Sequence, residues 1–253
     1  MPQTVKTNGL VIRETAVGES DKILTILTPE LGKISVYCKG VRSIKSHRMA
    51  ATQLFCYDEL TIAVRGDKYT LGEACLIENF FDIRSDICKF ALAQYFADLL
   101  CEVSVENEDQ SELLSLALNT FHILLSDKPL KLIKSVFELR VLCLIGLTPD
   151  ISACESCGKT AGEYYLDPVG GTVKCRECLF ESNSPDTYTS HAYIFIPSYV
   201  LRAMCYIIGA SKKRIFAFSA EDILLDTLEG VCEKYTLSQL GRGFESLNFY
   251  KSL

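Results

Sequence analysis

The sequence predicts an α+β protein in which a small β-barrel is followed by a helical domain, and a four-cysteine module interrupts the helices. Three observations carry this prediction. Short β-type segments fill the first part of the chain, apolar residues then recur at helical spacing, and two Cys-x-x-Cys pairs stand in the second half. We expect a barrel over 1–80, a helical domain formed by 81–150 and 181–253, and the module over 151–180.

Five short strands are predicted for the barrel. The residues from Lys33 to Cys38 alternate, which places Ile34 and Val36 on one face, and the run Arg65-Gly66-Asp67-Lys68 is a hairpin signal. The predicted strands are 10–12, 21–28, 33–38, 60–64 and 69–76. Five strands of this length fit an OB-like barrel, and a small SH3-like barrel fits the count almost as well.

Helical periodicity begins after the barrel region and resumes after the cysteine module. Start and stop signals set the expected bounds. The predicted helices are one within 83–105, one capped by Asp109 or Ser111 and running to Leu125, one from Pro129 to Gly146, one beginning at Pro197, one capped by Ser219 with Asp222, and one over 237–249. A polar link is expected at 181–190.

Two cysteine pairs predict a metal site. Cys154 and Cys157 form the first pair, Cys175 and Cys178 the second, and the stretch between them has the length typical of four-cysteine zinc sites. Two residues between thiolates let both sulfurs reach one tetrahedral ion. The segments around the intervening turn predict a zinc-ribbon-like hairpin. Because four thiolates fill the tetrahedron, we expect a structural Zn²⁺ rather than a catalytic one.

The sequence also allows two other roles for these four cysteines. A redox Cys-x-x-Cys would need one pair at a helix start in a strand–helix context, and an iron–sulfur cluster also accepts four thiolates. Most of the remaining eight cysteines lie inside apolar runs, so we expect them to be small buried side chains.

Bulk composition indicates an ordinary globular chain. Hydrophobic residues make up 48 % and charged residues 23 %, and the formal net charge is −6. Taken alone, this charge argues against nonspecific nucleic-acid binding, although a local basic patch can still bind phosphate. With neither a signal peptide nor a transmembrane span in the pattern, we expect a cytoplasmic protein.

One stretch of the barrel region is strongly basic. From Leu31 to Tyr57 there is no acidic residue, while Tyr37, Phe55 and Tyr57 supply aromatic rings. The fixed positive charges of this stretch are Lys33, Lys39, Arg42, Lys45 and Arg48. Such a stretch can follow a phosphate backbone while aromatic rings stack on bases. The alternative is a solvated basic loop. A second cluster, Lys212-Lys213-Arg214, stands between predicted helices, and we expect it to be a solvated helix-terminal group.

No catalytic constellation is present in the sequence. Gly158-Lys159-Thr160 resembles the end of a phosphate-binding loop, but Ala153 stands where the motif needs its first glycine. No nucleophile–base pair can be argued, so we expect a protein that is not an enzyme. Two other classes remain: a zinc-stabilised protein–protein adaptor, and a thiol–disulfide oxidoreductase that uses the cysteine pairs.

Two runs carry a resemblance to a known family. They are Gly18-Glu-Ser-Asp-Lys-Ile-Leu-Thr-Ile-Leu-Thr-Pro-Glu-Leu-Gly-Lys33 and Lys39-Gly40-Val41-Arg42. Together they resemble the N-terminal signature of RecO, a family of bacterial recombination mediators. The helical segment, the four-cysteine insert and a closing helix with Ser246-Leu247-Asn248-Phe249 follow in the family's order, so the resemblance covers nearly the whole chain.

The resemblance implies an N-terminal OB barrel, a helical domain and a zinc module. It also implies binding of single- and double-stranded DNA, annealing of complementary strands, and help in loading recombinase onto strands coated by single-strand-binding protein, near the nucleoid and without ATP. RecR and the acidic C-terminal tail of single-strand-binding protein are the implied partners. By position, the family's basic residues correspond to Lys33, Lys39 and Arg42, and less directly to Lys45 and Arg48.

Overall fold

The structure is a computed structural model that describes residues 3–181 and 193–253. It divides into two compact units. The barrel unit comprises Met1–Ser126 and Phe244–Leu253, and the module unit comprises Asp127–Gly243. The three-part division expected from the sequence is a different partition and stays a prediction. Apart from Glu181, the polar link expected at 181–190 lies outside the described residues.

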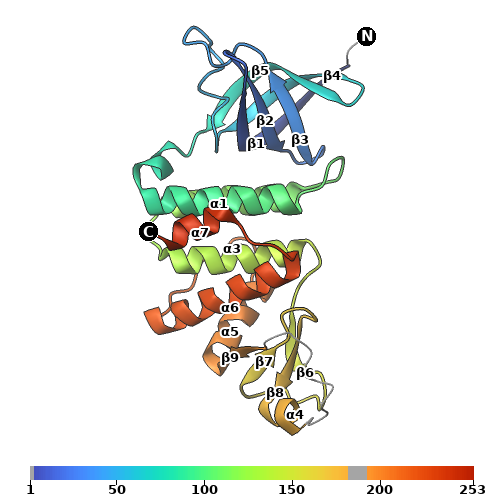
Figure 1. Cartoon of the computed structure of the whole chain (residues 1–253), viewed down its shortest axis with the longest axis vertical. Coiled ribbons are helices and arrows are strands. Elements are labelled where there is room, and N and C mark those ends of the chain that lie inside the picture. The colour runs from blue at the N-terminus through green and yellow to red at the C-terminus, as the bar shows by residue number, and fades with distance from the viewer. Residues whose placement is uncertain (1–2, 182–192) are drawn as a thin grey trace. The chain divides into compact units, whose positions relative to one another are not determined.

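A closed five-stranded barrel forms the first part of the barrel unit (Figure 1). Its strands are β1 (Gln3–Val17), β2 (Asp21–Leu27), β3 (Lys33–Cys38), β4 (Tyr57–Arg65) and β5 (Lys68–Glu78). They close in the order β1-β2-β3-β5-β4, and β3 runs parallel to β5. This order is that of an OB fold, so the OB-like prediction is confirmed and the SH3-like alternative is wrong.

Period-two burial explains why the barrel closes. Along β3, Ile34, Val36 and Cys38 are buried while Ser35 and Tyr37 are exposed. The inward side chains of the other strands complete one hydrophobic cluster. Each Å² of apolar surface removed from water contributes about 25 cal/mol to the free energy of folding. This cluster is therefore the main source of the barrel's stability.

Helices complete the barrel unit. They are the 3₁₀ turn η1 (Phe81–Ser85) and the α-helices α1 (Ile87–Val103), α2 (Ser111–Leu124) and α7 (Glu245–Lys251). Near its end, the segment between β3 and β4 carries Phe55, which is fully buried with a left-handed φ of 68°. Its ring packs edge-on against Phe90 of α1 and Phe121 of α2, at 5.9 and 5.1 Å between centroids. Phe55 therefore anchors this segment on the helices.

The module unit combines helices with a four-stranded sheet. Its helices are α3 (Leu130–Leu144), α4 (Arg176–Glu181), α5 (Ser198–Gly209) and α6 (Asp222–Leu240). Its strands are β6 (Asp150–Cys154), β7 (Tyr164–Leu166), β8 (Thr172–Cys175) and β9 (Ile194–Ile196), in the sheet order β6-β8-β7-β9. The predicted hairpin is confirmed, since β7 and β8 pair antiparallel with Tyr165 opposite Lys174.

Three helix predictions are wrong. The N-cap of α2 is Gln110, which makes no side-chain capping bond, and not Asp109 or Ser111 as expected. The helix expected over 237–249 is interrupted, because Gly241 adopts a left-handed φ of 64° and ends α6, and α7 starts only at Glu245. The cap expected at Ser219 is absent from the described structure, since α6 begins at Asp222 with Glu221 as N-cap and without a side-chain capping bond.

The buried state expected for most of the other cysteines holds only in part. Cys38, Cys56 and Cys232 are buried, whereas Cys75 and Cys205 are exposed on β5 and α5. In the part of the chain that the structure describes, no helix has the length and apolarity needed to cross a bilayer.

Candidate metal centre and cationic surface

The four predicted metal ligands come from β6, the turn after it, β8 and α4, all in the module unit. Cys154 ends β6 and Cys157 follows in the next turn, while Cys175 ends β8 and Cys178 lies on α4. Gly158 closes the first pair, because its left-handed φ of 72° lets its N–H donate to the Cys154 carbonyl at 2.8 Å. The first cysteine pair therefore spans a turn, and the second spans the junction of β8 with α4.

The sulfur atoms meet as a single metal ion requires. All four Sγ atoms lie within 4.8 Å of one another, and the Sγ atoms of Cys157 and Cys175 are 3.8 Å apart. Four sulfurs placed about 2.3 Å from a central tetrahedral ion lie about 3.8 Å from one another. The four cysteines thus fit a metal ion with no position left for water or substrate.

Backbone N–H groups favour the thiolate form that a metal needs. Burial opposes ionisation of Cys154, but N–H groups of Cys175, Cys157 and Ser156 that point at its sulfur prevail and lower the pKa of this thiol to about 6. The Cys175 N–H lies 3.3 Å from the Cys154 Sγ. The sulfur of Cys154 is therefore readily available as a thiolate ligand for a metal cation.

The loop between the first cysteine pair and β7 is closed by one carbonyl. The Lys159 carbonyl accepts hydrogen bonds from the Cys154 N–H at 2.8 Å and from the buried Tyr164 hydroxyl at 2.7 Å. Ion pairs Lys159–Glu177 and Lys174–Glu155 brace the outer side at 3.3 and 3.1 Å. These contacts hold the turn that carries Cys157.

The cationic segment, defined here as residues 39–48, lies between β3 and β4 and is clamped to the turn between β1 and β2. Gly40 N donates to the Asp21 carboxylate at 2.8 Å, and Arg42 N donates to the Ser20 carbonyl at 2.9 Å. The Arg42 guanidinium also donates to the Gly18 carbonyl at 2.9 Å. The two runs that carry the resemblance to RecO are therefore parts of one structural unit.

The structure places the five predicted cations in two different settings. Lys39, Arg42 and Lys45 are exposed, although the Arg42 guanidinium also donates to the Gly18 carbonyl. Lys33 is partly buried, and its ammonium donates to the Cys101 carbonyl of α1 at 2.7 Å. Arg48 donates to the carbonyls of Lys39, Leu71 and Gly72, at 3.0, 3.2 and 3.0 Å. Lys33 and Arg48 thus already hold barrel elements together.

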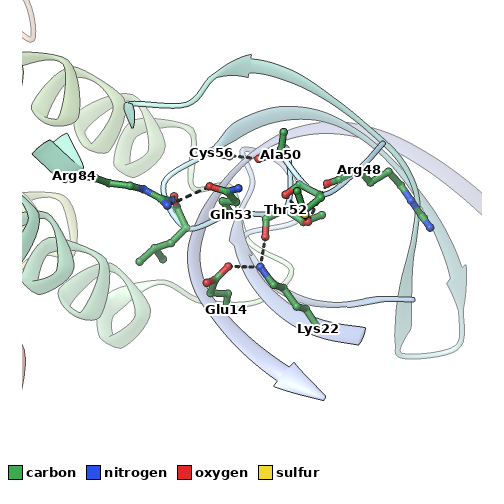
Figure 2. A network of polar contacts seen from close by, with 10 residues as sticks. Glu14, Lys22, Arg48, Ala50, Thr52, Gln53, Cys56 and Arg84 are labelled. Atoms are coloured by element: carbon green, nitrogen blue, oxygen red, sulfur yellow. Dashed lines mark hydrogen bonds and ion pairs between the residues drawn. The ribbon is translucent and has the colours of Figure 1, made fainter. Parts of the chain in front are cut away.

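A polar network fixes the C-terminal end of the cationic segment (Figure 2). Lys22 of β2 pairs with Glu14 at 2.7 Å and donates to the Thr52 carbonyl at 3.1 Å, and the Thr52 hydroxyl donates to the Arg48 carbonyl at 2.9 Å. Arg84 donates to the Gln53 side chain at 3.1 Å. Residues 52 and 53, just after the cationic segment, are therefore supported from β2 and from η1, and Thr52 passes this support to Arg48. These supports were not predicted, because they join residues far apart in the sequence.

The aromatic residues of the basic stretch also differ in availability. Tyr37 is exposed on β3, opposite Ile23 of β2, and its hydroxyl donates to Asp21. Phe55 is fully buried against α1 and α2, so it has no face to offer a base. Of these two rings, only that of Tyr37 is open to solvent.

These features define a class: an OB-fold barrel joined in one chain to a helical unit with a four-cysteine centre that could hold a metal ion. Comparison with known proteins names the family. The model "Recombination protein O N terminal" matches residues 1–80, and "Recombination protein O C terminal" matches residues 84–248. The chain therefore belongs to the RecO family of DNA repair proteins.

Individual relatives agree over nearly the whole length. A protein named DNA repair protein RecO from Acetivibrio thermocellus is 34% identical over 252 residues, which cover 98% of this chain and 97% of the relative. Another of that name, from Alkaliphilus metalliredigens, is 28% identical over 98% of this chain and 99% of its own length. A third, from Listeria monocytogenes, is 33% identical over 74% of this chain and 71% of its own.

Proposed function

We propose that this chain is a non-enzymatic DNA repair factor that binds single- and double-stranded DNA, anneals complementary strands and helps load recombinase onto strands coated by single-strand-binding protein. The observation that supports it is the set of three exposed cations, Lys39, Arg42 and Lys45, on a segment clamped to an OB barrel. OB folds commonly bind oligonucleotides on the face of their second and third strands.

Annealing follows from charge neutralisation. Cations on the cationic segment reduce the repulsion between two phosphate backbones, so the strands can approach while base pairing supplies the specificity. In this scheme Lys39, Arg42 and Lys45 touch phosphate, whereas Lys33 and Arg48 act through the contacts that position the segment. Exposed Tyr37 is the ring that offers a base-stacking surface beside them.

The proposed partners and location rest on membership of the family rather than on a surface of the structure. We propose RecR and the acidic C-terminal tail of single-strand-binding protein as partners, and association with the nucleoid in the cytoplasm. A partner that adds positive charge would offset the net charge of −6.

We propose Zn²⁺ as the ion of the four-cysteine centre. Zinc accepts four thiolates in a tetrahedron. An iron–sulfur cluster attaches its cysteines to several irons and spreads the sulfurs further apart, whereas here all four lie within 4.8 Å. The ion would tie β6, β8 and α4 together at one end of the sheet, and its binding would be coupled to folding.

Fluorescence anisotropy with a labelled single strand, titrated across salt concentrations, tests the DNA-binding proposal. We expect affinity to fall linearly with log salt, and the variant Lys39→Glu with Arg42→Glu to bind at least about tenfold more weakly at low salt. The matched control is Lys213→Glu with Arg214→Glu, an equal charge reversal at exposed positions of the module unit. Equal binding by the wild type and the first variant would contradict the site.

A zinc-stabilised adaptor without nucleic-acid binding is the second candidate. It is favoured by the acidic net charge and by the engagement of Lys33 and Arg48 with main-chain carbonyls. Absence of binding at low salt, even after RecR is added, would favour this reading over the first.

A further inference from the structure

Ile44 is the most solvent-exposed of the large hydrophobic side chains among the described residues, at 93 %. It stands two residues after Arg42 and immediately before Lys45, both of which are exposed. Isolated surface hydrophobic residues are common and need no function. An almost fully exposed branched side chain between two cations is a more specific arrangement.

Hydrogen-bonded turns hold Ile44 in this position. Ser43 N donates to the Gly40 carbonyl at 3.3 Å, Ser46 N donates to the Ser43 carbonyl at 2.8 Å, and Met49 N donates to the Ser46 carbonyl at 3.2 Å. Together with the contacts from Asp21 and Ser20, these bonds order the backbone on both sides of Ile44. Its side chain is therefore presented to solvent by an ordered loop.

The surroundings indicate what this side chain meets. The stretch from Leu31 to Tyr57 carries no acidic residue, so a ligand approaching Ile44 passes positive charge on both sides. A ligand that suits both features has negative charge along its edge and flat apolar faces inside. A nucleic-acid strand has both, with phosphates spaced so that neighbouring bases can part around a wedge.

We propose that Ile44 inserts between neighbouring bases of a DNA strand whose phosphates are held by Arg42 and Lys45. The inference rests on the proposed function, because it deepens the DNA-binding role of the cationic segment. Aliphatic wedges part base steps in other DNA-binding proteins, where backbone contacts offset the loss of stacking. A parted step would keep bases of a bound strand accessible to a complementary strand.

The test compares three forms of the full chain on a labelled single strand that carries 2-aminopurine, whose fluorescence rises when it is unstacked. The variants are Ile44→Ser and the matched control Ile223→Ser, which changes an isoleucine that is 72 % exposed on α6. We expect emission to rise when the wild type or the control binds, and to stay low with Ile44→Ser.

Salt titration distinguishes the contribution of the Ile44 side chain to affinity from that of the cations. Ile44→Ser should weaken binding about five- to tenfold at every salt concentration with an unchanged slope, whereas Lys45→Gln should reduce the slope by about 0.7. Because Ile44 is exposed, Ile44→Ser should fold like the wild type, which thermal melting checks.

Each other outcome overturns the wedge for a distinct reason. Salt-dependent binding with unchanged 2-aminopurine emission, or equal affinity of Ile44→Ser and wild type, removes the wedge and leaves the proposed function standing. No binding by the wild type at low salt, even after RecR is added, removes both. Binding to anionic phospholipid vesicles that Ile44→Ser abolishes, without any emission change on DNA, would reassign Ile44 to a membrane surface.

Discussion

Asp21 and Gly40 connect two loops of the barrel that are separated by the whole of β2 and β3. Oδ1 of Asp21 accepts a hydrogen bond from the Gly40 N–H at 2.8 Å, and Gly40 adopts a left-handed φ of 68° that suits glycine. The Tyr37 hydroxyl donates to the other carboxylate oxygen. The hydrogen bond from Tyr37, and then that from Gly40, lower the pKa of Asp21 below its ordinary value.

Replacing Asp21 by alanine should loosen the start of the cationic segment. We expect faster hydrogen exchange at the Gly40 amide and weaker DNA binding with an unchanged salt slope, since the cations remain but are no longer held. Hydrogen exchange by NMR and anisotropy titration measure the two effects. The control is Glu19→Ala, an exposed carboxylate in the same turn. Equal exchange at Gly40 in both variants would contradict this role of Asp21.

Replacing Cys175 by serine should release the metal and destabilise the module unit. A hydroxyl does not replace a thiolate at a four-cysteine site, and metal binding is coupled to folding in modules of this size. Elemental analysis should find about one zinc per chain in the wild type and almost none in the variant. Cys205→Ser, at an exposed cysteine outside the centre, should keep its metal. Full metal content in Cys175→Ser would rule against four-thiolate coordination.

Local sequence patterns were sufficient for the barrel and the metal hairpin. Strand β3 was predicted at its observed bounds. The alternation of apolar and polar residues along it, and the glycine before it, are signals that depend only on neighbouring residues. The four cysteines were predicted to meet because metal spacing is also a local signal, and their sulfurs do lie within 4.8 Å of one another.

Long-range contacts account for what the sequence did not reveal. Nothing near Lys33 indicates that its ammonium donates to Cys101, and nothing near Arg48 indicates that its guanidinium reaches Leu71. The sequence prediction grouped Lys33 and Arg48 with the exposed cations because it used their charge alone. Likewise, α7 belongs to the barrel unit, because α7 follows the break at Gly241 and packs on α1.

Asp58 should make the stability of the barrel unit depend on pH. It occupies an inward position of β4 next to Leu60, is fully buried, and neither carboxylate oxygen has a hydrogen-bond partner among the described residues. Burial raises the pKa of Asp58 to about 7. The folded protein therefore keeps a proton that the unfolded chain releases at lower pH.

The sign of the effect follows from proton linkage. Between the ordinary carboxyl pKa and about 7, the folded state binds more protons, so the free energy of unfolding falls as pH rises. From pH 5 to pH 8 the wild type should lose roughly 2–4 kcal/mol relative to Asp58→Asn, which cannot ionise. Urea denaturation at several pH values measures this difference. The control is Glu59→Gln at the adjacent exposed position, which should follow the wild type.

A buried ion cluster joins α3 to α6 within the module unit. Lys134 is fully buried and lies 3.0 Å from Glu138, 3.8 Å from Glu229 and 2.8 Å from Glu233. Burial opposes the charge on Lys134, but the carboxylates of Glu138 and Glu233 prevail and raise the pKa of its ammonium above the ordinary value. The single positive charge of Lys134 thus offsets part of the negative charge of three carboxylates.

Replacing Lys134 by methionine should destabilise the module unit by about 3–5 kcal/mol, because it leaves the fully buried carboxylate of Glu138 without its cation. The variant Lys134→Met with Glu138→Leu should recover much of this loss, since Glu229 and Glu233 are partly exposed and can turn toward water. Urea denaturation followed by circular dichroism measures both. Lys131→Met, which removes an exposed pair with Asp226, should leave the midpoint nearly unchanged. A double variant less stable than Lys134→Met would show that Glu138 stabilises the helices through other contacts, and that its pairing with Lys134 is not the reason for its burial.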